Sequence, residues 1–202
     1  RKPDRSFDAF WEALAPTLSE RAVVYTVDGA WVRPYEARLP QGKAALEATG
    51  LLSQLGLPIV CPKLARFSNI LTHRDVGTPL LSIRDVLDLL DSSGVQAGMR
   101  PGDCPQPLRR QESWTRLWDT IEELLEPSRL QRNSTDESTE TARLSCAPIA
   151  LDGSGVLQEP RSLFRADGDT RQLFPLVPWL ADDNPAHPLL TRLVPSFGPS
   201  EA

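Results

Sequence analysis

The sequence predicts an α+β fold, built of β-hairpin units with short sheets that pack against amphipathic helices. Residues 25–40, "YTVDGAWVRPYEARLP", have the pattern of a strand, an Asp-Gly turn, a second strand and a proline-led helical turn. A similar pattern returns at residues 149–164, "IALDGSGVLQEPRSLF". The segments between and beside these hairpins have the apolar spacing of helices.

The first hairpin follows from its residue types. "AVVYTV", residues 22–27, is rich in β-branched and aromatic residues, and "AWVR" returns as its partner strand. Asp28-Gly29 predicts a tight turn, because such turns need a positive φ that Gly adopts without steric cost. Pro34 opens a short helix, since the N–H that proline lacks is not needed there.

The second hairpin is aligned with the first by placing Asp152 on Asp28 and Pro160 on Pro34. Its turn, "DGSG", is longer, which accounts for the two additional residues before the proline. Hairpins with Asp-Gly turns are common, so coincidence is one interpretation of the recurrence. The other is a repeated supersecondary unit.

Capping residues and apolar faces predict the helices. Ser82 begins "SIRDVLDLLDSSG", where Asp85 stands at the capping-box position and Gly94 is a natural stop. Residues 112–127 form the strongest predicted helix, with Pro127 at its end. Its apolar face consists of Trp114, Leu117, Trp118, Ile121, Leu124 and Leu125. Residues 130–143, "LQRNSTDESTETAR", are polar and nearly free of apolar side chains, which predicts a mobile loop.

We expect one α+β module over residues 1–202, and two lobes, 1–129 and 144–202, are the alternative. The chain starts without Met and without an apolar signal region, so we interpret it as a piece of a longer chain. No apolar run approaches the ~18 residues of a membrane span. Three widely spaced Cys fit a reducing cytosol. We therefore expect a cytoplasmic protein without a membrane partner.

Charge and motifs argue against several function classes. The net charge of −5 argues against a protein whose main task is to bind nucleic acid. No GxGxxG, Walker lysine loop, HExxH or GxSxG occurs, and neither Cys nor His has the spacing of zinc ligands. We therefore expect no catalytic residues, no metal and no cofactor.

Two groups of residues would support an enzyme domain instead. Cys61 and His73 would form a nucleophile and its base, although Cys61 ends an apolar strand, where Cys is usually a small buried hydrophobe. Asp182-Asp183-Asn184 would gather a divalent ion, although adjacent acids in a loop are usually solvated.

Aromatic and cationic residues near the turns are the candidates for partner contact. Trp31 lies in the first hairpin and Trp179 in a proline-rich segment, and Trp often anchors protein interfaces. Packing in the core is the alternative for each Trp. Arg33 and Tyr35, close to Trp31 in the sequence, complete the candidate set.

Four segments form a wider pattern: "VVYTVDGAWVRPYEARLP", "LLSQLGLPIVCPKLARFSNIL", "GTPLLSIRDVLDLL" and "APIALDGSGVLQEPRSLF". In their hairpins, turns and apolar positions they resemble the region behind the nucleotide-binding domain in sacsin-like proteins. These are large chains with a GHKL-type ATPase domain similar to that of heat-shock chaperones. The resemblance implies an α+β fold and an ATPase domain outside this chain, and it implies no catalytic residue here.

The resemblance also implies a function. It is that of a non-catalytic scaffold or client-interaction module, which responds to the nucleotide state of the neighbouring ATPase domain and contacts a protein client. The enzyme domain described above is one alternative. A nucleic-acid accessory module of a bacterial defence-type ATPase is another, and it requires Arg33, Arg38, Lys43 and Lys63 to line one face.

Overall fold

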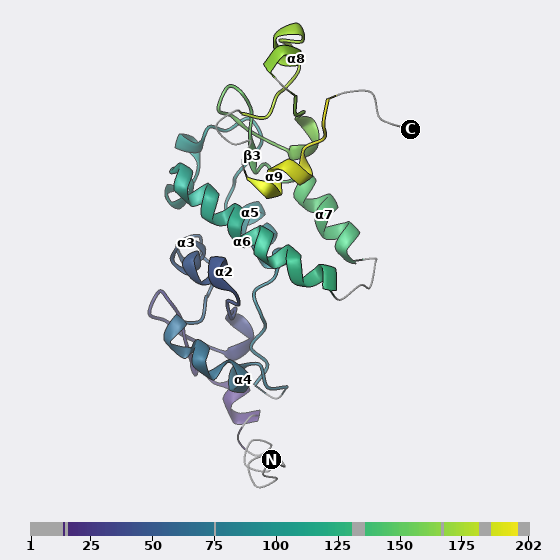
Figure 1. The fold of residues 1–202 in the computed structure, drawn as a ribbon. Helices are drawn as coiled ribbons and strands as arrows, with labels where there is room; N and C mark the ends of the chain where they lie inside the picture. Colours follow the sequence, from purple (N-terminus) through teal and green to yellow (C-terminus); the bar gives the residue numbers. More distant parts are fainter. Residues whose placement is uncertain are drawn as a thin grey trace. The chain divides into compact units, whose positions relative to one another are not determined.

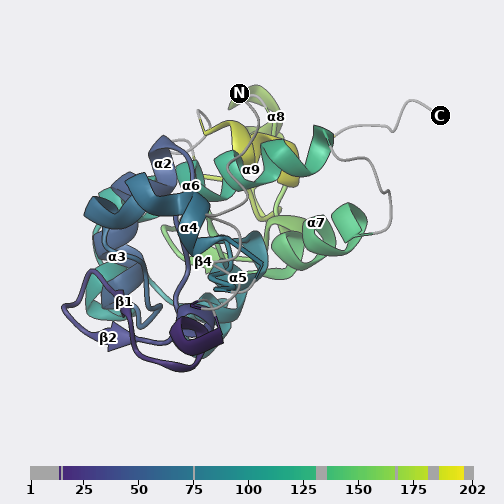
Figure 2. The same cartoon turned by 90° about the horizontal axis from the view of Figure 1, so that it is seen from below.

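The computed structural model describes residue 14 and residues 16–74, 76–130, 136–166, 168–181 and 187–197. It contains helices and two-stranded antiparallel sheets, which confirms the predicted α+β class (Figures 1 and 2). The chain divides into two compact units, Arg1–Leu81 and Ser82–Ala202. We call them unit 1 and unit 2. The boundary between Leu81 and Ser82 lies earlier in the chain than the one predicted from the sequence, which separated lobes 1–129 and 144–202.

Unit 1 begins, after helical residues 16–20, with a hairpin of β1 (Val24–Tyr25) and β2 (Trp31–Val32). The strands are antiparallel, with Val24 opposite Val32 and Tyr25 opposite Trp31 (Figure 2). As predicted, Pro34 opens a helical turn. The elements after the hairpin are the 3₁₀ helix η1 (Pro34–Glu36), α2 (Lys43–Glu47), α3 (Thr49–Gln54), the 3₁₀ helix η2 (Pro62–Phe67) and α4 (Ser68–Leu71).

In unit 1 the hairpin and its 3₁₀ turn are hydrogen-bonded to two short extended segments, at residues 58–61 and 79–81. We call this hydrogen-bonded set the backbone frame. The N–H of Val27 donates to Ile59 O at 2.9 Å, and the N–H of Cys61 donates to Tyr25 O at 2.9 Å. On the other side, Leu39 donates to Pro79 O at 2.9 Å. The frame encloses a small core of Val24, Ala37, Leu39 and Val60, each at most 1% exposed.

Unit 2 begins with α5 (Ile83–Ser92), whose start follows the prediction. Ser82 caps the helix, and the Ser82 and Asp85 side chains form the expected capping box. Further along are η3 (Pro101–Asp103), η4 (Gln106–Leu108), α6 (Gln111–Leu130) and α7 (Asp136–Cys146). The remaining elements are β3 (Ala150–Leu151), β4 (Leu157–Gln158), η5 (Pro160–Ser162), α8 (Gly168–Leu173) and α9 (Pro188–Leu193).

The apolar face of α6 forms much of the core of unit 2, as its spacing predicts. Trp114, Leu117, Trp118 and Ile121 are each at most 1% exposed. The Trp118 indole N–H donates to Ile149 O at 2.9 Å, which ties α6 to the residue before β3. Helix α6 also contacts α5 and α9, and α7 contacts α5 and α9 (Figure 1).

Two sequence predictions in this region are wrong. Helix α6 does not end at Pro127 but continues to Leu130. Residues 136–143, predicted as part of a mobile loop, belong to α7. Helix α7 is polar overall, but Leu144 is fully buried and Arg143 pairs with α5, so tertiary contacts override its composition.

The backbone frame of unit 1 recurs in unit 2 with equivalent hydrogen bonds. Residues 24–39 correspond one to one with residues 150–165, and the strand register is the same in both hairpins. Each bridge that joins the hairpin of unit 1 to a later segment has a counterpart in unit 2. The equivalent backbone donors are Thr26 and Asp152, Val27 and Gly153, Arg38 and Phe164, Leu39 and Arg165, Val60 and Leu180, Cys61 and Ala181, and Leu81 and Phe197.

The recurrence in the sequence is therefore a repeated building unit, but the alignment of its turns must be corrected. Asp152 is equivalent to Thr26, not to Asp28, because both accept the bond that closes the turn: Gly29 donates to Thr26 O and Gly155 to Asp152 O. Gly29 and Gly155 both have a positive φ, +88° and +71°. The "DGSG" turn is thus no longer than the first turn.

Candidate partner-contact site

The first hairpin presents aromatic side chains to solvent. Trp31 is 62% exposed, Tyr35 51% and Tyr25 37%. Tyr25 lies opposite Trp31 across the two strands, so both side chains project from the same face, and their ring centroids are 5.1 Å apart. We call Tyr25, Trp31, Arg33 and Tyr35 the aromatic hairpin surface.

Arg33 is held in place by its neighbours. Its Nη1 donates to the Tyr35 hydroxyl at 2.7 Å, and its backbone N–H donates to the Glu36 carboxylate at 2.9 Å. The hydrogen bond to Tyr35, with the nearby negative charges of Glu36 and Glu20, raises the pKa of Arg33 above its usual value. The cation and the Tyr35 ring therefore form one ordered feature on the hairpin.

Of the four residues that the sequence predicts for partner contact, Trp31, Arg33 and Tyr35 meet on this surface and Trp179 does not. Trp179 is 9% exposed, and its indole N–H donates to Phe174 O at 3.1 Å. Its ring packs edge-on against Phe197, with centroids 5.0 Å apart. For Trp179 the alternative, packing in the core, is the one that the structure shows, and this residue is the counterpart of buried Ile59 in the repeated frame.

Tyr25 is the residue that sequence reasoning missed. Its alternation with buried Val24 along β1 was the available signal, because neighbouring residues of a strand face opposite sides. The register with Trp31, which depends on the turn, then places the two rings together.

The same positions in unit 2 are covered. Leu157, the counterpart of Trp31, is fully buried, and Leu151, the counterpart of Tyr25, is 8% exposed. The outward edge of β4 is also occupied: Leu157 N–H donates to Met99 O at 2.7 Å, and Gly98 N–H donates to Leu157 O at 2.8 Å. Trp31 has no counterpart of these two bonds within the described part of the chain.

The two residues considered as nucleophile and base differ in their burial. Cys61 is half-buried and its backbone belongs to the frame, whereas His73 is exposed. Asp182-Asp183-Asn184 lies outside the described residues. Across the described residues, no group of three or more His, Cys, Asp or Glu is placed to hold a metal ion. Burial raises the pKa of the Cys104 thiol, which disfavours its reactive thiolate form.

Three of the four cations considered for nucleic-acid contact, Arg33, Arg38 and Lys43, have partners within the chain. Arg38 Nη1 donates to Tyr35 O at 3.1 Å and to Ala37 O at 3.2 Å, and Lys43 lies 3.8 Å from the Glu47 carboxylate. These contacts orient the side chains of Arg33 and Arg38 on the hairpin, and both keep their positive charge.

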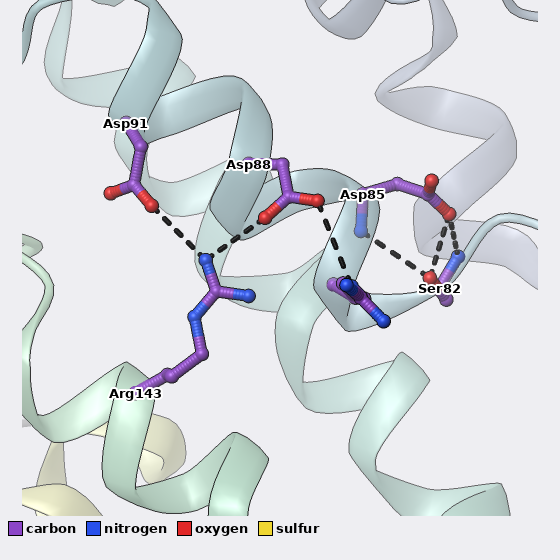
Figure 3. Close-up of polar contacts among 6 residues, drawn as sticks. Ser82, Asp85, Asp88, Asp91 and Arg143 are labelled. Carbon is purple, nitrogen blue, oxygen red and sulfur yellow. Dashed lines mark hydrogen bonds and ion pairs between the residues drawn. The ribbon is translucent and has the colours of Figure 1, made fainter.

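An apolar cavity between α5 and α7 is the other notable surface. It is lined by Leu87, Asp91, Thr139, Ala142, Arg143, Cys146 and Ala147. At its rim Arg143 Nη2 contacts Asp88 at 2.9 Å and Asp91 at 3.0 Å (Figure 3). The hydrogen bond to Asp88 is the main cause of the raised pKa of Arg143. These ion pairs join two helices of unit 2, and because they are exposed each contributes at most about 1 kcal/mol.

Comparisons with family models, curated proteins and solved structures found no match to this chain. In the part of the chain that the structure describes, none of the helices combines the length and the apolar character that crossing a bilayer requires.

Proposed function

We propose that this chain is a non-catalytic interaction module of a sacsin-like, chaperone-type ATPase in the cytoplasm. It couples an ATP-binding domain outside the 202 residues to a protein partner. The aromatic hairpin surface is the contact region, and ATP binding by the neighbouring domain changes how that surface is presented.

One observation favours this function over the enzyme and nucleic-acid alternatives. The hairpin of unit 1 exposes two neighbouring aromatic rings, tilted against each other, at positions whose counterparts in unit 2 are buried. Large exposed aromatic rings are costly in water and typical of protein interfaces. The exposure is specific to unit 1, because the equivalent backbone positions in unit 2 carry the buried side chains of Leu151 and Leu157.

Nucleotide binding tests the first half of the proposal. We expect calorimetric titration of ATP with Mg²⁺ into the 202-residue chain to give no saturable heat, since the nucleotide chemistry lies in another domain. Saturable binding by this chain alone would sink that half of the proposal.

Replacement of the contact rings tests the second half. Tyr25→Ala, Trp31→Ala and Tyr35→Ala are combined in the longer protein that carries the ATPase domain, and suppression of aggregation of an unfolded client is measured. We expect the loss of that activity with ATP binding retained. Phe67→Ala, which removes an exposed aromatic residue of η2 (41% exposed) that is not one of the four residues of the aromatic hairpin surface, is the matched control. Full activity in the triple variant would refute the role of the surface.

A further inference from the structure

The edge of β2 at Trp31, to which no described segment is hydrogen-bonded, has an occupied counterpart in the same chain. In unit 2 the turn at Gly98–Met99 sits against Leu157, where it accepts from the Leu157 N–H and donates to the Leu157 carbonyl. The chain segment involved is "VQAGMRPGD", residues 95–103. Gly98 has a φ of +92°, a conformation that Gly adopts far more readily than other residues.

We propose that the outward edge of β2 at Trp31 is a docking site for a glycine-containing polypeptide segment of a partner protein, bound as Gly98–Met99 is bound at Leu157. The inference rests on the proposed function and specifies its partner. The segment offers one carbonyl and one N–H to Trp31, so that recognition is mainly by backbone hydrogen bonds. The side chains of Tyr25 and Trp31 are then covered, as those of Leu151 and Leu157 are.

Three features support a polypeptide as the occupant. The groups at Trp31 that have no partner among the described residues are a main-chain donor and a main-chain acceptor, which another main chain complements. The register of the hairpin is identical in both units, so these groups point outward in unit 1 as they do in unit 2. Arg33 Nη1 donates to the Tyr35 hydroxyl, which holds a half-exposed aromatic ring close to these main-chain groups for contact with a side chain of the bound segment.

The probe for this site is a synthetic peptide with the sequence VQAGMRPGD, titrated into the ¹⁵N-labelled 202-residue chain. Because a short peptide with two hydrogen bonds and one aromatic contact binds weakly, the titration extends to about 5 mM. We expect saturable shifts of the Trp31 backbone amide and indole, and slower hydrogen exchange of that amide. The Leu157 amide should not shift, because its own segment is attached to the chain and outcompetes a free peptide.

A modified peptide and a substitution in the protein distinguish docking at Trp31 from non-specific peptide binding. A peptide with N-methylglycine at the Gly98 position lacks the donor for the Trp31 carbonyl, and we expect about tenfold weaker binding. Trp31→Ala should weaken binding of the unmodified peptide to a similar extent, about tenfold, and Phe67→Ala should leave it unchanged. A Trp31 amide that does not shift, or equal binding of both peptides, would overturn the docking site.

The outcomes also distinguish this inference from the proposed function. If the peptide fails to shift Trp31 while the triple alanine variant of the longer protein loses client protection, the mode of docking is wrong and the function stands. If the peptide docks as expected while the triple variant keeps client protection, the site exists and the proposed function is wrong.

Discussion

The two hairpins of this chain share a backbone and differ in their surroundings. Residues 24–39 of unit 1 correspond one to one with residues 150–165 of unit 2. The rings of Tyr25 and Trp31 are nevertheless exposed, whereas their counterparts Leu151 and Leu157 are buried. The backbone frame therefore does not dictate which side chains are covered. The two hairpins also differ at the outer edge of the second strand, which in unit 2 is hydrogen-bonded to Gly98–Met99.

What the two copies retain in sequence explains how they keep one frame. Arg38 donates to Pro58 O and Leu39 to Pro79 O, and the corresponding acceptors in unit 2 are also prolines. Proline at these positions supplies a carbonyl acceptor, fixes φ and leaves no N–H of its own to be satisfied. The identical residues at equivalent positions are Gly29 and Gly155, Pro34 and Pro160, Pro58 and Pro178, and Pro79 and Pro195.

The largest expected effect is a difference in unfolding free energy between substitutions at two equivalent positions, buried Leu157 and exposed Trp31. We expect Leu157→Ala to destabilise unit 2 by about 2–5 kcal/mol, because it leaves a cavity in a packed core. Trp31→Ala should cost less than about 1 kcal/mol, the contribution of one partly exposed ring pair. Urea denaturation followed by amide signals of each unit measures both effects. Comparable losses at the two positions would mean that Trp31 is part of a core after all.

Substitution of the turn glycines should lower the free energy of unfolding by less than Leu157→Ala does, and by the same amount in both turns, because Gly29 and Gly155 share a backbone conformation. Gly29→Ala and Gly155→Ala should each cost about 1–2 kcal/mol, the penalty of a left-handed conformation for a residue with Cβ. Contacts do not add to this cost, since an added Cβ meets no atom closer than 3.5 Å at Gly29 and none within 4 Å at Gly155.

Gly153 provides the control for the turn substitutions. It lies in the same turn as Gly155, has no positive φ and has open space around an added Cβ. Gly153→Ala should therefore be neutral or slightly stabilising. If Gly29→Ala and Gly155→Ala differ by more than about 1 kcal/mol, the two turns are not equivalent in energy.

Features set by local chemistry could be predicted from the sequence. The cap at Ser82, the turn at Gly29 and the helical turn at Pro34 each depend on residues within a few positions, and each is found in the structure. The features that sequence reasoning missed depend on distant partners. Helix α7 has a polar composition, but Leu144 is fully buried and Arg143 pairs with Asp88, which is far away in the sequence.

The candidate site shows the same limit. Trp31 and Trp179 both follow turn-forming residues, and nothing beside them in the sequence separates the exposed ring from the buried one. The difference is in long-range packing: Trp179 contacts Phe197, whereas the edge next to Trp31 has no counterpart of Gly98–Met99 in the described residues. The alignment of the two turns by their Asp-Gly pairs failed for a related reason, because the hydrogen bonds equate Thr26 with Asp152.

The smallest expected effect is the pH dependence of the first turn. The Thr26 hydroxyl donates to Asp28 Oδ1, and this bond lowers the pKa of Asp28 below its usual value of 3.8. A carboxyl whose pKa is lowered in the folded state stabilises that state above its unfolded pKa, and the contribution is lost as the pH falls through the folded pKa. The turn should therefore weaken only below about pH 4, by less than about 0.5 kcal/mol because the carboxylate is exposed and screened.

Substitutions in both units isolate this effect. Thr26→Val removes the donated bond, so an NMR titration should show the pKa of Asp28 moving up toward its usual value. In unit 2 the turn carboxylate belongs to Asp152, which is equivalent to Thr26 and not to Asp28. Its Oδ1 accepts from the N–H groups of Ser154 and Val156. Ser154 occupies the place of Asp28 and does not titrate, so Ser154→Ala should leave the acid response of either hairpin unchanged. A pKa of Asp28 at or above 3.8 in the unsubstituted chain would contradict the assignment of the Thr26 hydroxyl as donor.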